Sequence, residues 1–271
     1  MSDFSIQGKV VIITGGTGAL GGSLAENFVR EGATVILLSR DQAKIDQKVS
    51  ELQSLGKDNV YGYSCDVLNI EGLKEVRDKI ISRFGRVDAL INCAGGNIPS
   101  ATQKEGQSVF DLEISSIDDA IKLNMQGAVY PSLIFGEVMA EKGQGNIVNI
   151  SSMATFSAIT RVMGYTLAKS GINSFTQWLA CELADKYGDK LRVNAIAPGF
   201  FIGDQNRKLL LNEDGSLTDR SKKVIHKTPM RRFGELTELN GIAQFLCSDA
   251  ASFITGAVIP VDGGFSAFSG V

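Results

Sequence analysis

The chain has 271 residues, of which 44% are hydrophobic and 21% are charged, and its formal net charge is −3. This mild acidity argues against a general nucleic-acid binder, which normally carries a basic stripe. Because no apolar run approaches the roughly 20 residues of a membrane span and the first residues show no secretory signal, we expect a cytoplasmic protein without a membrane partner.

Seven short apolar runs rich in β-branched residues alternate with longer amphipathic stretches. The runs cover residues 10–13, 35–38, 60–63, 88–92, 146–150, 192–197 and 258–261. The amphipathic stretches between the first four runs are residues 20–31, 42–55 and 70–84. Near-continuous apolar strands joined by helices indicate a parallel sheet that is covered on both faces. Because no Pro/Ser-rich linker divides the chain, the pattern predicts one doubly wound α/β domain over residues 1–271.

A glycine-rich stretch, residues 14–21, lies between the first run and the first amphipathic stretch. Glycine lets the backbone turn tightly and approach a pyrophosphate, whose charge the helix N-terminus stabilises. A glycine-rich stretch by itself often marks no more than a turn. Its place between a strand and a helix favours a dinucleotide site.

The second run is followed by Ser39 and Arg40. At this position an NAD site commonly has an acidic residue that binds the ribose 2′-hydroxyl. A small hydroxyl and a forked cation suit a 2′-phosphate better. The sequence therefore favours NADP(H). The alternative is that Arg40 only begins a solvated helix, and NAD(H) then remains possible.

The segment after the fourth run departs from simple alternation. Residues 95–115 are polar and contain glycine, and Ser116 and Asp119 then have the spacing of a capping box that opens a helix through about residue 140. Pro131 inside this helix predicts a kink. Ligands of open α/β sheets bind beyond the carboxyl ends of the strands. We therefore expect residues 95–115 to form a substrate loop.

Tyr165 and Lys169 are four residues apart in a segment with helical character. Two side chains at this spacing share one helix face. An ammonium beside a phenol stabilises the phenolate, which predicts a lowered pKa for Tyr165 and a role as general acid–base. An isolated pair of this kind is more often part of a solvated helix face, so the pair gains weight only from the other features of the chain.

Residues 200–227 form a second polar segment, which follows the sixth run and contains Asp214 and Gly215. Its place after a strand predicts a movable lid over the substrate.

Cysteine and histidine content limits the chemistry further. The four cysteines, Cys65, Cys93, Cys181 and Cys247, are far apart and show no paired spacing. We interpret them as small core residues in a reducing compartment. A single histidine, His226, excludes a multi-histidine metal site and argues against a Ser-His-Asp triad. We expect no metal.

Together these motifs resemble those of the short-chain dehydrogenase/reductase family over nearly the whole chain. Residues 14–21 are similar to the family's glycine motif, with Ala19 in place of the middle glycine, and residues 92–95 are similar to its Asn-Asn-Ala-Gly motif. Four residues match the family's catalytic tetrad: Asn124, Ser152, Tyr165 and Lys169. Only the spacing to Tyr165 selects Ser152 over Ser151. The resemblance implies a single-domain Rossmann-type doubly wound parallel sheet of about seven strands, with helices on both faces.

The resemblance also implies which residues contact the dinucleotide. The expected contacts are Gly15, Thr17, Gly18, Leu20, Gly21, Ser39, Arg40, Asp66, Val67, Asn92, Ala94, Gly95, Tyr165, Lys169, Pro198, Gly199 and Ile202. Asp66 corresponds to the residue that contacts adenine. Gly203 stands where the family commonly has a cofactor-contacting threonine, so one contact to the carboxamide is in question.

A narrower resemblance, to the branch described as D-mannonate oxidoreductase or fructuronate reductase, lies in residues 94–97, 175–178, 198–201, 205–207, 228–230 and 263–265. It implies hydride exchange between a keto sugar acid and its hydroxy acid. The alternatives are a gluconate 5-dehydrogenase-like enzyme, a 3-oxoacyl reductase and, as a different class, a non-catalytic cofactor-binding regulator. Members of the family are commonly homotetramers, which implies assembly through the long helices and the C-terminal strand.

A sugar-acid substrate requires a partner for its carboxylate and for its hydroxyls. Arg207 is the first candidate for the carboxylate, with the equal alternative that it is an exposed lid residue paired with Glu213 or Asp214. Arg161 is the second candidate. The expected substrate contacts are Asn97, Ser152, Arg161, Gln205 and Arg207.

Overall fold

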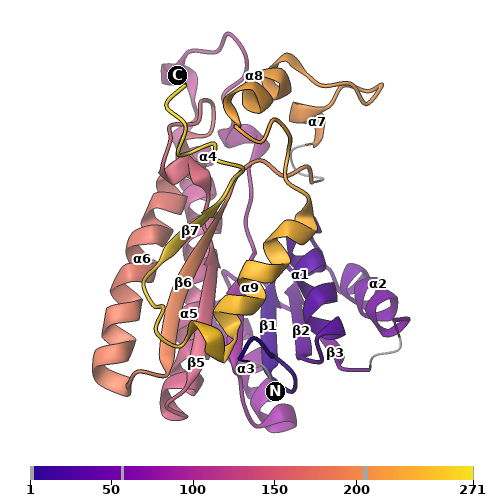
Figure 1. Cartoon of the computed structure of the whole chain (residues 1–271), viewed down its shortest axis with the longest axis vertical. Helices are drawn as coiled ribbons and strands as arrows, with labels where there is room; N and C mark the ends of the chain where they lie inside the picture. The colour runs from indigo at the N-terminus through magenta and orange to yellow at the C-terminus, as the bar shows by residue number, and fades with distance from the viewer. Residues whose placement is uncertain (1–2, 56–57, 204–206, 271) are drawn as a thin grey trace.

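The computed structural model describes residues 3–55, 58–203 and 207–270. Seven parallel strands form one sheet in the order β3-β2-β1-β4-β5-β6-β7 (Figure 1). The strands are β1 (Val10–Thr14), β2 (Thr34–Ser39), β3 (Val60–Ser64), β4 (Ala89–Asn92), β5 (Gly145–Ile150), β6 (Leu191–Pro198) and β7 (Val258–Val261). Each of the seven apolar runs is thus confirmed as a strand, with bounds that differ by at most one residue from those expected.

The strands are joined by helices that cover both faces of the sheet. The helices are α1 (Ala19–Arg30), α2 (Gln42–Gln53), α3 (Ile70–Phe84), α4 (Ile114–Ile121), α5 (Gly127–Glu141), α6 (Met163–Tyr187), α7 (Arg207–Leu210), α8 (Asp219–Lys227) and α9 (Asn240–Cys247). Alternate residues of β1 enter two separate cores. Val11 and Ile13 pack with α1 and α9, whereas Val10 and Ile12 pack with α3, α5 and α6. This confirms the single-domain, doubly wound architecture.

The helical region before α5 differs from the expected one. Glu113 is the N-cap of α4, and Ser116 lies inside the helix, buried, with its hydroxyl donating to the Glu113 carboxylate at 3.2 Å. The expected capping box at Ser116 is therefore wrong, because the helix begins before it. A π-helical segment, Lys122–Gln126, separates α4 from α5. The irregularity thus precedes Pro131, which lies within α5.

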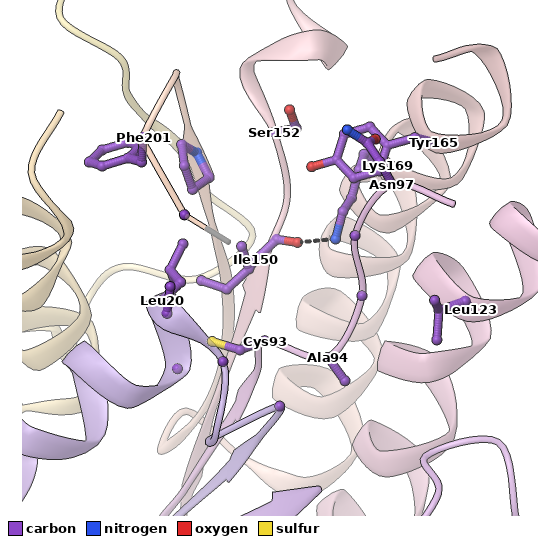
Figure 2. Close-up of a pocket in the computed structure, with 18 of the residues that line it drawn as sticks. Leu20, Cys93, Ala94, Asn97, Leu123, Ile150, Ser152, Tyr165, Lys169 and Phe201 are labelled. Carbon is purple, nitrogen blue, oxygen red and sulfur yellow. Dashed lines mark hydrogen bonds between the residues drawn. The ribbon is translucent and has the colours of Figure 1, made fainter. Parts of the chain in front are cut away.

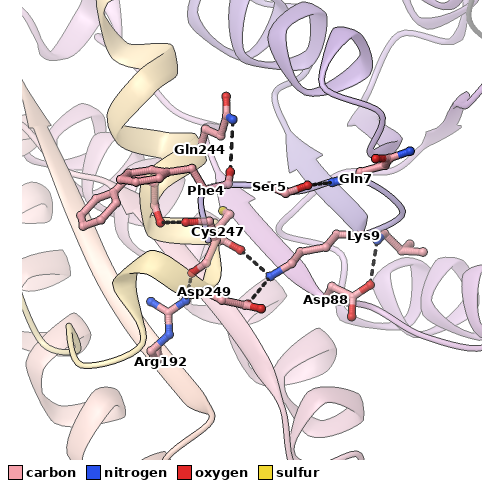
Figure 3. A network of polar contacts seen from close by, with 12 residues as sticks. Phe4, Ser5, Gln7, Lys9, Asp88, Arg192, Gln244, Cys247 and Asp249 are labelled. Carbon is pink, nitrogen blue, oxygen red and sulfur yellow. Dashed lines mark hydrogen bonds and ion pairs between the residues drawn. The ribbon is translucent and has the colours of Figure 1, made fainter. Parts of the chain in front are cut away.

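A polar network at the amino ends of the strands fastens the end of α9 to the sheet (Figure 3). The ammonium of Lys9 donates to the Cys247 carbonyl at 3.0 Å and to the Asp249 carboxylate at 2.8 Å. The buried guanidinium of Arg192 donates to the Ser248 carbonyl at 2.9 Å. These contacts lie beside the starts of β1 and β6, at the end of the sheet opposite the carboxyl ends of the strands.

Residues 207–227 of the expected lid lie beyond those carboxyl ends, and residues 204–206 are outside the part of the chain that the structure describes. α7 and α8 pack against each other there (Figure 1), so residues 207–227 are largely helical, which a polar sequence with glycine did not indicate. None of the helices described is long and apolar enough to cross a membrane. All four cysteines are free, but Cys181 is exposed, which corrects the expectation that all four are core residues.

Candidate active site

A cavity of about 870 Å³ opens at the carboxyl ends of the strands. The glycine-rich turn after β1 and the segments that follow β2, β4, β5 and β6 line it, together with residues of α6, α7 and α8. Figure 2 shows Leu20, Cys93 and Ala94 on one side of this space and Ser152, Tyr165 and Lys169 on another. Residues that are far apart in the sequence therefore meet at one end of the sheet.

The glycine-rich turn is held by contacts within the protein itself. The buried hydroxyl of Thr14 accepts hydrogen bonds from the backbone N–H groups of Cys93 and Ala94, both at 3.1 Å. Gly15 has φ +65°, and a Cβ on Gly21 would lie 2.5 Å from the Gly15 carbonyl oxygen. Position 21 therefore requires glycine, because the backbone of Gly15 leaves no room for a side chain there. The result is a helix N-terminus at the cavity wall that no side chain caps, which suits a pyrophosphate.

The end of β2 carries hydroxyl and cationic groups. The Ser39 and Thr17 hydroxyls are 2.9 Å apart, and Arg40 is exposed at the cavity edge. The Asp41 carboxylate accepts from the backbone N–H of Lys44 at 3.2 Å and caps α2. Lys44 also lines the cavity, but nothing in its sequence context distinguishes it from the other charged residues of α2.

Tyr165 and Lys169 lie on one face of α6, as their spacing predicted, but they interact differently from the expectation. The Lys169 ammonium donates to the Ile150 carbonyl at 2.7 Å and lies 5.6 Å from the centre of the Tyr165 ring (Figure 2). Burial raises the pKa of the Tyr165 phenol, and a hydrogen bond with Ser152 opposes this rise. Burial lowers the pKa of Lys169 to about 8. The expected lowering of the Tyr165 pKa by Lys169 is therefore wrong for this structure, because burial dominates and the ammonium bonds a carbonyl.

Two serines follow β5, and the structure distinguishes them. The Ser151 hydroxyl donates to Asn173 at 2.5 Å. The Ser152 hydroxyl accepts from the backbone N–H of Ala154 at 3.1 Å and lines the cavity together with Tyr165, whose pKa it lowers. Ser152 is thus the serine next to the phenol, as the spacing indicated.

Asn124 lies behind the cavity wall, in the π-helical segment. Its side-chain amide donates to the carbonyls of Gly96 and Ala120, both at 2.9 Å, and its oxygen accepts from the Gly96 N–H at 2.8 Å. The residue is fully buried and is not one of those that line the cavity. It anchors the start of the loop after β4.

Most of the expected cofactor contacts line the cavity: Gly15, Thr17, Gly18, Leu20, Gly21, Ser39, Arg40, Asp66, Val67, Ala94, Gly95, Tyr165, Lys169, Pro198 and Gly199. Two expected contacts do not line it. Ile202 is outside the wall, and Asn92 is buried in the sheet, where its amide donates to Ser132 at 2.9 Å and Asn149 at 2.8 Å. Asn92 is the last residue of β4, and its side chain bonds α5 and β5 instead of lining the cavity. A residue that belongs to a cofactor motif therefore need not contact the cofactor.

The expected substrate contacts separate into three groups. Asn97 and Arg161 line the cavity with Ser152, and the side-chain oxygen of Asn97 is buried without a hydrogen-bond partner among the described residues. Arg207 is exposed on α7 and does not line the cavity, which corrects its place as first carboxylate candidate. Gln205 lies outside the described residues.

Arg220 lines the cavity and was missed by sequence reasoning. It lies in the first turn of α8 among Asp219, Lys222 and Lys223, a run that has the composition of a solvated helix. No signal in the sequence separates this cation from its neighbours. Among the described residues, no group of three or more His, Cys, Asp or Glu side chains is placed to hold a metal ion.

Comparisons with known proteins span nearly the whole chain. A family profile described as Enoyl-(Acyl carrier protein) reductase matches residues 16–266. The uncharacterized oxidoreductase UxuB of Bacillus subtilis (strain 168) is 41% identical over 276 residues, which cover 98% of each protein. A Haemophilus influenzae protein proposed to be a D-mannonate oxidoreductase, solved with bound NAD, has a TM-score of 0.91 at 41% identity and 98% coverage of both chains. A gluconate 5-dehydrogenase from Burkholderia cenocepacia J2315, solved with NADP and tartrate, has a TM-score of 0.86 at 25% identity, again over 98% of both chains.

Proposed function

The chain belongs to the short-chain dehydrogenase/reductase family and is an NAD(P)-dependent oxidoreductase, and we propose that it interconverts a keto sugar acid and its hydroxy acid, of the D-fructuronate/D-mannonate type. The observation that carries the chemistry is the cluster of Ser152, Tyr165 and Lys169 on one wall of the cavity, next to a dinucleotide-type glycine turn. The sugar-acid class is supported by similarity to the Haemophilus influenzae and Burkholderia cenocepacia proteins.

The cavity wall fits a dinucleotide. The uncapped N-terminus of α1 would hold the pyrophosphate, Asp66 would hold the adenine, and Lys169 would hold the nicotinamide ribose. When bound, the nicotinamide supplies or accepts the hydride, because no protein side chain can. A 2′-phosphate is favoured by Ser39, Arg40 and Lys44, which line this part of the cavity. The Haemophilus influenzae relative, however, was solved with NAD.

Three side chains of this chain would handle the proton. In reduction, Tyr165 donates a proton to the carbonyl oxygen of the substrate, and Ser152 stabilises the negative charge that develops there with a hydrogen bond. The raised pKa of the phenol keeps it protonated at neutral pH, as a proton donor must be. Lys169 contributes a positive charge next to the phenol. Asn124 is a positioning residue, since it fixes the backbone of Gly96.

The loop and lid remain part of the proposal. Residues 95–115 would border the substrate as its loop, with the unpartnered oxygen of Asn97 available to accept from a sugar hydroxyl. Residues 200–227, with α7 and α8, would cover the substrate as its lid. A lid on one short and one longer helix can move as a unit while the sheet stays fixed.

Assembly as a homotetramer is also part of the proposal. Large apolar side chains are exposed on the long helices, among them Leu133 on α5 and Leu167 and Trp178 on α6. Such residues support burial between copies of the chain. Sedimentation of the intact chain measures the number of subunits. The four free thiols support a reducing, cytoplasmic setting.

Two classes of function compete with the proposal, one that changes the substrate and one that lacks turnover. A gluconate 5-dehydrogenase or a 3-oxoacyl reductase would keep the chemistry and change the substrate, and a cofactor-binding regulator would have lost turnover. Arrangement of Ser152 against Tyr165 in an open cavity favours an enzyme. The test is reduction of fructuronate, 5-ketogluconate and an acetoacetyl thioester with NADH and with NADPH. Turnover of the thioester alone would contradict the sugar-acid proposal, and dinucleotide binding without turnover of any ketone would favour the regulator.

A further inference from the structure

Two arginines reach the cavity from different parts of the chain. Arg161 lies just before α6, and Arg220 lies in the first turn of α8. Both line the cavity that Ser152 and Tyr165 also line. One cation thus comes from the fixed side of the site and the other from the proposed lid.

The two guanidinium groups are held in place by neutral acceptors. The Nε of Arg161 donates to the Gln103 carbonyl at 2.6 Å, and the Gln103 N–H donates back to the Arg161 carbonyl at 2.9 Å. Arg220 donates to the hydroxyl and to the carbonyl of Thr160, both at 3.4 Å. Within residues 3–55, 58–203 and 207–270, neither guanidinium forms an ion pair with a carboxylate, although both line a cavity.

The pair of like charges is costly without an anion. Burial, and then the positive charge of Arg161, lower the pKa of Arg220. The backbone of Arg161 is also strained, because its φ of +79° is in the region that favours glycine. Strained residues and unpaired cations that share a cavity are typical of ligand sites.

We propose that Arg161 and Arg220 together bind the carboxylate of the substrate while its ketone faces Ser152 and Tyr165. The proposal rests on the proposed function, which it deepens by naming the residues that select an acid over a neutral ketose. A carboxylate between two forked cations accepts charge-assisted hydrogen bonds from both. Because Arg220 belongs to α8, a bound carboxylate also links the lid to the segment before α6.

Fructuronate and fructose provide a matched pair of substrates, since they differ in a carboxylate against a hydroxymethyl group. We expect the parent chain to favour fructuronate. Arg220→Gln should lower kcat/KM for fructuronate by about 30-fold, mainly through KM, and change that for fructose by less than about threefold. Arg220→Lys keeps the charge and loses the fork, so it should recover part of the loss. Lys223→Gln removes an exposed charge from the same helix and should leave both substrates unchanged.

Equal losses for the two substrates, or an unchanged KM for fructuronate in Arg220→Gln, would overturn the carboxylate assignment. Preference of the parent chain for a sugar phosphate over the sugar acid would overturn it as well. Calorimetric binding of D-mannonate against D-mannitol separates this proposal from the proposed function, because it requires no turnover. We expect Arg161→Gln and Arg220→Gln each to weaken mannonate binding at least about tenfold and to leave mannitol unaffected. If no ketone is reduced and mannonate still binds through the arginines, the proposed reaction is wrong and the site is right.

Discussion

The ammonium of Lys169 lies 5.6 Å from the centre of the Tyr165 ring, and its hydrogen bond goes to the carbonyl of Ile150 at 2.7 Å. The lysine is only 5% exposed. It is therefore a buried cation beside a phenol to which it does not donate. This arrangement has consequences for stability and for the pH dependence of activity.

Replacing Lys169 should stabilise the fold. Its pKa falls from 10.5 to about 8 because the charged form is buried. Between these values the unfolded chain binds the proton and the native chain does not, so the cost to stability is full below the lower pKa and disappears above the higher one. A fall of this size corresponds to about 3 kcal/mol, and the lost hydrogen bond to Ile150 offsets about 1 kcal/mol of it. We expect Lys169→Met to raise the free energy of unfolding by about 2 kcal/mol at neutral pH while turnover is lost.

Chemical denaturation of the parent and of Lys169→Met at neutral and at strongly alkaline pH measures this difference. The increase in the free energy of unfolding should be smaller at the alkaline pH, where Lys169 of the parent is neutral in the native and in the unfolded chain. Lys223→Met, at an exposed site, should change stability by less than about 0.5 kcal/mol. A Lys169→Met chain that is less stable than the parent at neutral pH contradicts the burial cost.

The same lysine predicts how reduction depends on pH. Below a pKa of about 8 Lys169 is charged, and above it the charge beside Tyr165 is lost. We expect kcat/KM for the reduced dinucleotide, which reports groups of the free enzyme, to be level below this pKa and to fall above it. A rate that stays level or rises across this range in the reduction direction would show that Lys169 does not act as a cation.

Two neighbouring glycines of α1 provide a matched test of the dinucleotide turn. A Cβ on Gly21 would meet the Gly15 carbonyl oxygen at 2.5 Å, whereas one on Gly22 would meet the flexible end of Lys48 at 3.1 Å. Gly21→Ala should weaken NADPH and NADH binding by about tenfold or more, and Gly22→Ala should leave both within about threefold. Fluorescence titration measures the dissociation constants. Equal effects of the two substitutions would mean that the close approach at Gly21 does not shape the site.

Arg40 should decide the choice of dinucleotide. Its guanidinium is exposed at the cavity edge beside Ser39, where it can reach a 2′-phosphate. We expect Arg40→Ala to raise the dissociation constant of NADPH by about tenfold and that of NADH by less than about threefold. The NADH titration is the internal control. Similar losses for both dinucleotides would rule out phosphate recognition by Arg40.

The sheet and its order of elements could be predicted because each strand is a short apolar run bounded by helical periodicity. The glycine turn and the neighbours Tyr165 and Lys169 could also be placed, since local spacing determines them. The direction of the Lys169 hydrogen bond could not, because it depends on the carbonyl of Ile150 from another element. Arg220 was missed for the same reason, as only the placement of α8 beyond the carboxyl ends of the strands brings one cation of a charged helix to the cavity.

The most direct test is turnover by Tyr165→Phe, with Tyr130→Phe as a control because that phenol bonds Gln126, away from the cavity. The assay is reduction of a ketone that the parent chain accepts, with the dissociation constant of the dinucleotide measured in parallel. We expect Tyr165→Phe to lower kcat by at least about 10³-fold and to leave dinucleotide binding within about threefold, while Tyr130→Phe retains activity. Turnover by Tyr165→Phe within about tenfold of the parent would contradict the assignment of Tyr165 as the proton donor.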